Sequence, residues 1–165
     1  MLTVFDELPD SSRVWVYGVD RPIERSGESL LLGEVDNYLT TWSAHGVPLS
    51  AARKWDGRFL TVAVDQTRAG ASGCSIDGLF RTLKSLEPNI GAAVVTSGLV
   101  FFRGKDGAIR SVTRDEFGEL GARGEVNGET EVFDPSVTSL GEWRARFSSH
   151  AANSWHRSLL PSPTG

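Results

Sequence analysis

The sequence has a single cysteine and no long apolar run, and each scarcity excludes a class of protein. One cysteine, Cys74, cannot form a disulfide within the chain, so nothing indicates an oxidising compartment. No apolar run approaches the roughly 20 residues that a membrane-spanning helix needs. The first residues, MLTVFDELPDSS, lack a basic region followed by an apolar core, so no secretory signal is expected. These absences predict a cytoplasmic protein that does not act in a membrane.

Net basic charge is also missing. The 165 residues include 17 Lys and Arg against 21 Asp and Glu, which gives a net charge of −4. A nucleic-acid partner held mainly by charge is therefore not expected, because no net basic field drives counterion release. Arg144, Arg146 and Arg157 gather near the C-terminus, where they form either a local basic patch or an ordinary solvated helix face and tail.

Several motifs that would name a reaction are absent from the sequence. There is no G-x-x-x-x-G-K-[ST] phosphate loop, no G-x-G-x-x-G opening a helix after a strand, and no G-x-S-x-G nucleophile turn. One cysteine and three scattered histidines give no zinc-ligand spacing. We therefore expect no cofactor and no metal site.

The strands are predicted from apolar runs and turn signals. RVWVYGV (Arg13–Val19) is apolar on both faces, as a buried strand is. Asp56–Gly57 and the GKDG stretch each separate two such runs, which is typical of hairpins. The expected strands are 13–19, 49–55, 58–65, 99–103, 108–112 and 129–133.

The helices are predicted from apolar residues at helical spacing and from capping pairs. One helix is expected over 26–44, and another from near Ser75 until Pro88 stops it. Thr113 with Glu116, and Ser139 with Glu142, indicate two more helix starts. The order predicts an α+β fold, with a largely antiparallel sheet of about five to six strands and three to four packed helices. Residues 1–160 are expected to form a single domain, and 161–165 a flexible C-terminal tail.

The stretch AGASGCSID, residues 69–77, places Cys74 between a strand and a helix. Unpaired N–H groups and the helix dipole favour an anion at a helix N-terminus. This favours two functional interpretations: the loop binds an anionic group, or Cys74 is an activated nucleophile. Asp77 in the first turn disfavours a thiolate. A third interpretation is that Cys74 is a small buried apolar residue.

The anion-binding interpretation is our first hypothesis: a small anionic ligand, or a protein partner, binds at the glycine-rich loop. Small residues let a ligand approach the loop's backbone closely, and arginines and an aromatic ring would complete the site. The candidate binding residues are Gly70, Ser72, Gly73, Ser75, Arg21, Arg58 and Trp155.

The alternative hypothesis is a cysteine-dependent enzyme that catalyses acyl transfer, hydrolysis or thiol redox chemistry. Cys74 would be the nucleophile, with His45 or His156 as the base and Asp77 nearby. His45 is expected at the C-terminal end of the first helix, and His156 follows Trp155. No spacing places a base beside Cys74, so binding is ranked first. An interaction protein with an exposed aromatic surface is a third hypothesis, because the chain has five tryptophans.

The chain resembles a family of bacterial proteins that is common in Bacteroidetes and their relatives. The resemblance rests on FDELPDSSRVWVY, DRP, WSAHG, RFLTVAVDQ, ASGCSID, VFD…GEW and SWH. It implies a bacterial, cytoplasmic, single-domain protein, and it supplies no reaction, ligand or catalytic residue. Some members carry the label "ABC transporter ATPase", but this chain has neither the phosphate loop nor the length that such an ATPase requires.

Overall fold

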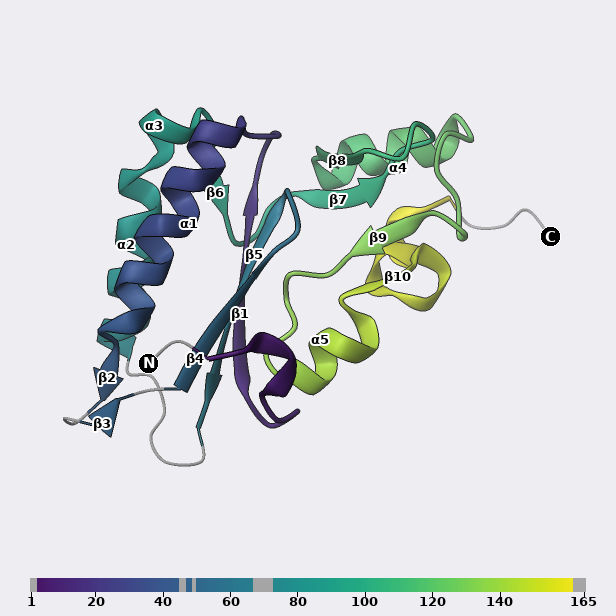
Figure 1. Cartoon of the computed structure of the whole chain (residues 1–165). Coiled ribbons are helices and arrows are strands. Elements are labelled where there is room, and N and C mark those ends of the chain that lie inside the picture. Colours follow the sequence, from purple (N-terminus) through teal and green to yellow (C-terminus); the bar gives the residue numbers. More distant parts are fainter. Residues whose placement is uncertain (1–2, 45–46, 49, 67–72, 162–165) are drawn as a thin grey trace.

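Two four-stranded antiparallel sheets form the centre of the molecule (Figure 1). The computed structural model describes residues 3–44, 47–48, 50–66 and 73–161, and at 43–44, 47–48 and 73–75 only the backbone. The first sheet has the order β4-β5-β1-β6, with β1 (Arg13–Val19), β4 (Ser50–Trp55), β5 (Phe59–Asp65) and β6 (Val94–Val95). The second has the order β10-β9-β7-β8, with β7 (Val100–Arg103), β8 (Ile109–Val112), β9 (Glu131–Phe133) and β10 (Ser148–His150). A separate ribbon pairs β2 (Ser43–Ala44) with β3 (Val47–Pro48).

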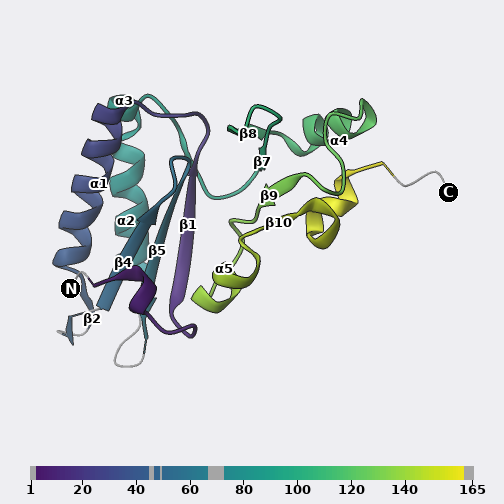
Figure 2. The same ribbon diagram turned by 45° about the vertical axis from the view of Figure 1, so that its right-hand side comes forward.

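Helices α1 (Arg25–Thr40) and α2 (Gly73–Ser85) lie on one side of the first sheet, and α5 (Leu140–Arg146) lies on its other side, toward the second sheet (Figures 1 and 2). Helix α3 (Glu87–Ile90) also lies beside the first sheet, and α4 (Arg114–Ala122) accompanies the second. Three short 3₁₀ helices complete the described elements: η1 (Phe5–Glu7), η2 (Ala151–Asn153) and η3 (Trp155–Leu159). No helix in the described ranges is both long and apolar enough to span a bilayer.

Strand β5 is buried on both faces, which explains its continuous apolar sequence FLTVAV. Its Leu60, Val62 and Val64 face the helices, where they pack with apolar residues of α1 and α2. Its Phe59 and Ala63 face the other way, into a core shared with the second sheet. A third apolar cluster lies on the far side of the second sheet, under α4 and η3. The layers are therefore helices, sheet, sheet and helix.

Aromatic rings fill the space between the two sheets. The centroid of the Phe59 ring lies 4.7 Å from that of Phe101, 5.4 Å from that of Phe133 and 5.0 Å from that of Phe147. At Gly18 in β1, an added Cβ would lie 2.7 Å from Cζ of Phe101. A side chain at position 18 would therefore meet the Phe101 ring of the second sheet.

Arg58 joins the two sheets by hydrogen bonds. Its side chain is buried, and Nε and Nη2 both donate to the carbonyl oxygen of Val19, each at 3.1 Å. Nη1 donates to the carbonyl oxygen of Ile109 at 2.6 Å, and Nη2 to Oγ of Ser111 at 2.7 Å. One guanidinium thus connects the end of β1 with the edge strand β8. Burial lowers the pKa of Arg58, and the charge of Asp20 opposes that change.

The α+β class, the antiparallel pairing and the two hairpins confirm the sequence predictions, and β1 has the predicted bounds. The prediction of one sheet with five to six strands is wrong. The strands form two sheets, because β9 pairs with β7 and β10 while β5 pairs with β1 and β4. The described residues contain five α-helices rather than three to four.

Two predicted helix ends also differ from the structure. Pro88 lies in the first turn of α3 instead of terminating α2, since proline fits where no intrahelical N–H bond is lost. Helix α1 ends at Thr40, four residues before its predicted end. Leu159 and Leu160 pack partly buried against the third cluster. Of the predicted tail 161–165, residues 162–165 lie outside the described part of the chain.

Candidate functional site

The predicted site around Cys74 is only partly within the described residues. Gly70, Ser72 and His45 lie outside them. The backbone of residues 73–75 forms the start of α2, so Cys74 belongs to the first turn of that helix as expected. Asp77 is exposed one turn further along. Helix α1 ends at Thr40 and residues 43–44 form β2, so the helix predicted to run to residue 44 ends earlier, while His45 itself stays outside the described residues.

The structure does not bring the predicted arginines to the start of α2. Arg58 immediately precedes β5, whereas α2 follows the other end of that strand. A strand of this length separates its two ends by roughly 20 Å. Arg21 lies at the same end as Arg58, because Gly18 in β1 pairs with Phe59. Its side chain is exposed and forms an ion pair with Asp20 at 3.4 Å.

Trp155 and His156 lie in η3, in the layer beyond the second sheet, so they do not approach Cys74 through the fold either. Ser154 starts this short helix, because its side chain accepts a hydrogen bond from the backbone N–H of His156. The segment then packs closely on α4, where a Cβ added at Gly121 would lie 2.9 Å from Cδ of Pro161.

His156 is fully buried beneath Trp155. The two ring centroids are 3.8 Å apart, and the Phe117 ring approaches from another side at 6.2 Å. Nδ1 lies 2.6 Å from Oγ of Ser154, and Nε2 has no hydrogen-bond partner among the described residues. Burial lowers the pKa of His156 to about 4. The negative charge of Asp134 opposes this change, and the positive charge of Arg114 adds to it. The imidazole is therefore neutral at neutral pH.

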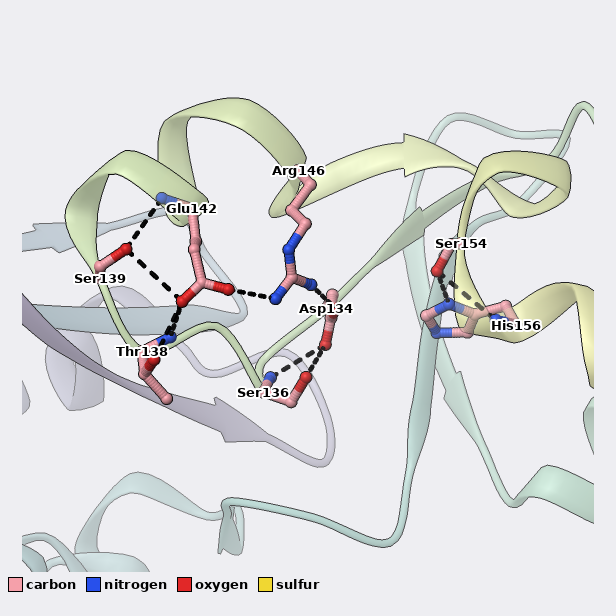
Figure 3. Close-up of polar contacts among 8 residues, drawn as sticks. All are labelled: Asp134, Ser136, Thr138, Ser139, Glu142, Arg146, Ser154 and His156. Carbon is pink, nitrogen blue, oxygen red and sulfur yellow. Dashed lines mark hydrogen bonds and ion pairs between the residues drawn. The ribbon is translucent and has the colours of Figure 1, made fainter. Parts of the chain in front are cut away.

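The buried Asp134 forms an ion pair with the exposed Arg146 next to this segment (Figure 3). Oδ2 of Asp134 accepts from Nη1 of Arg146 at 2.6 Å, and Oδ1 accepts from the backbone N–H of Ser136 at 3.0 Å. Burial alone would raise the pKa of Asp134, but hydrogen bonds from Ser136 and Trp155 and the charge of Arg146 lower it. Arg146 also pairs with Glu142 and lowers the pKa of that carboxyl to about 2. The guanidinium is thus held between two ionised carboxylates.

Two adjoining cavities lie around this group. The first has a volume of about 630 Å³ and the second about 410 Å³. They share the lining residues Ala152, Ser154, Trp155 and Arg157. The first cavity is also lined by Gly128, Ser158, Leu160 and Pro161, and the second by Asp134, Arg146, Ser149 and Asn153. We call these the first cavity and the second cavity below.

The wall common to both cavities carries an uncompensated positive charge. The Arg157 side chain is exposed and makes no ion pair with any residue in the described ranges. Trp155 beside it is 38% exposed, and Cζ of Arg114 lies 5.3 Å from the centroid of its ring. The negative charge of Asp134 is already matched by Arg146. The free charge at this place therefore favours an anion.

Sequence reasoning identified part of this group and missed the rest. It selected Trp155 and His156 from SWH, and it noted Arg146 and Arg157, with Arg144, as either a basic patch or an ordinary solvated surface. It missed Asp134 and Ser154, although an acid followed by Pro and Ser directly after a strand is a sequence pattern that favours a turn held by the acid's side chain.

No protein-family profile, no curated protein and no solved structure matches this chain. The fold and the site just described therefore carry the functional argument on their own.

Proposed function

We propose that the protein binds a small anionic ligand in the two cavities around Trp155 and Arg157. The observation that carries this proposal is the Arg157 guanidinium, which has no ion-pair partner in the described ranges and lines both cavities beside an exposed tryptophan. Arginine presents a planar set of donors that matches carboxylate and phosphate groups.

The surroundings of Arg157 support binding in three ways. The cavity volumes lie within the range of small-molecule sites, which is about 300 to 1,000 Å³. Ser149, Ser154 and Asn153 add uncharged hydrogen-bonding groups that can orient a ligand without competing for its charge. The ring of His156 stacks against that of Trp155, and because the imidazole is neutral it adds no charge to the site.

The proposal is tested by nuclear magnetic resonance titration with inorganic phosphate and with acetate. The indole N–H signal of Trp155, assigned from Trp155→Phe, is expected to shift in a saturable way. Arg157→Gln should weaken that response at least tenfold. Arg25→Gln, which removes an exposed arginine on α1, should leave it unchanged. A Trp155 signal that does not move with either anion, or that responds equally in Arg157→Gln, would refute the proposal.

The first turn of α2 is a second candidate, since α2 begins at Gly73 as the anion-binding hypothesis requires. The same titrations separate the two candidates, because this site would move the amide signals of residues 73–77 instead. The alternative of a cysteine-dependent enzyme is tested by the pH dependence of iodoacetamide labelling of Cys74. Labelling only after denaturation would eliminate it. Membership of the bacterial family that the sequence resembles, and a cytoplasmic location, stay proposals alongside these.

A further inference from the structure

The two cavities differ in the chemistry of their walls. Apart from the shared residues, the first cavity is lined by Gly128, Leu160 and Pro161, with Ser158 as the one polar side chain. The second is lined by charged and amide or hydroxyl side chains. A ligand that fills both would therefore meet an apolar wall at one end and a polar wall at the other.

The polar end is better suited to a single negative charge than to two. Arg157 supplies one free cation, whereas both end nitrogens of Arg146 already bind Asp134 and Glu142. Asp134 remains ionised beside the second cavity, because its hydrogen bonds lower its pKa. A second charge on the ligand would face this carboxylate without a further cation among the residues that line the second cavity. Arg114, whose Cζ lies 5.3 Å from the centroid of the Trp155 ring, lines neither cavity.

We infer that the ligand is an amphiphilic monocarboxylate, with its carboxylate in the second cavity against Arg157 and a short apolar group in the first cavity. This inference rests on the proposed function and adds the ligand's class and orientation. Trp155 lies at the junction, where an amphipathic ring can contact the apolar group with its face or edge while its N–H serves the polar side.

The test is a series of probes of constant charge and growing apolar length: acetate, butyrate and hexanoate, with 1-hexanol and inorganic phosphate for comparison. The Trp155 indole signal of the full chain reports binding. Each methylene that enters the first cavity should tighten binding by about fourfold, the equivalent of the transfer of one CH₂ from water. Hexanoate should therefore bind more than a hundredfold tighter than acetate, and 1-hexanol should bind more weakly than hexanoate.

A matched variant separates the two ends of the site. Ser158→Phe fills the first cavity and leaves the second untouched, because Ser158 lines only the first. It should remove the advantage of hexanoate over acetate while acetate binding persists. If this variant does not fold, the series on the natural chain still decides the matter. Equal affinities for acetate and hexanoate, or tighter binding of phosphate than hexanoate, would overturn the inference and leave the proposed function standing. No binding of any anion would refute both.

Discussion

His156 should make the folded protein less stable as the pH falls from about 6.5 to 4. In the folded state, burial under Trp155 and against Phe117 lowers its pKa to about 4, whereas an unfolded chain restores a value near 6.5. At a pH between these two pKa values, the imidazole is protonated in the unfolded chain and neutral in the folded protein. Stability is therefore complete above pH 6.5, decreases as the pH falls, and loses nothing further from this group below about pH 4.

The size of the effect follows from the same two pKa values. At pH 5 the unfolded chain gains a roughly thirtyfold statistical advantage from protonation of this one imidazole, which corresponds to about 2 kcal/mol of unfolding free energy. Carboxyls such as Asp134 and Glu131 have lowered pKa values, so they stabilise the fold above their unfolded pKa near 4 and lose that contribution only at lower pH. Burial raises the pKa of Asp56, so that carboxyl changes stability in the opposite direction as the pH falls. The comparison with a variant that lacks the imidazole therefore isolates the histidine.

Urea denaturation at pH 7.5, 6.5, 5.75 and 5.0 measures this loss. The natural chain should lose about 2 kcal/mol more across the series than His156→Gln, in which no group titrates at that position. His150→Gln, at an exposed position in β10, should keep the slope of the natural chain. Parallel curves for the natural chain and His156→Gln would show that the imidazole is not held neutral by burial, and the reasoning would fail.

Two further predictions concern the junction between the sheets. Arg58→Met should reduce the unfolding free energy by about 3 kcal/mol in urea denaturation, because buried carbonyl oxygens lose a charged donor. The control Arg25→Met, at an exposed site, should change the unfolding free energy by under about 0.5 kcal/mol. Equal effects of the two variants would contradict the role of Arg58. Gly18→Ala should cost about 1 to 3 kcal/mol, because the new methyl group meets the Phe101 ring, whereas Gly33→Ala in α1, with open space around its Cβ, should raise helix stability by up to about 1 kcal/mol. If Gly18→Ala leaves the thermal stability unchanged, the two sheets can move apart at this contact without cost.

Local features of the fold were predictable because local sequence determines them. Asp56–Gly57 gives the hairpin between β4 and β5, with Gly57 at φ +80° as such a turn requires. Thr113 and Glu116 form the expected capping box of α4. The division into two sheets was not predictable in this way. The division depends on which strand pairs with β9, and in the structure that strand is β7. The apolar residues of β9 would suit a single sheet equally well.

The candidate site shows the same limit. SWH made Trp155 and His156 candidates, because an aromatic ring and an imidazole follow one another near the end of the chain. The distances that matter join residues from different elements. Arg146 reaches Asp134 only because α5 reverses the chain between β9 and β10, and Arg58 is buried only because β8 lies across the end of β1. Neither contact can be predicted from the spacing or the composition of the sequence.

The Arg58 junction has a consequence for how the molecule comes apart. Its acceptors are two carbonyl oxygens and a hydroxyl group, none of which takes up a proton at any pH where the chain folds. Acid therefore leaves this connection intact while it loosens the layer that contains η3 and α4. Between pH 6.5 and 5, the loss of stability therefore arises at His156 and not at the Arg58 junction.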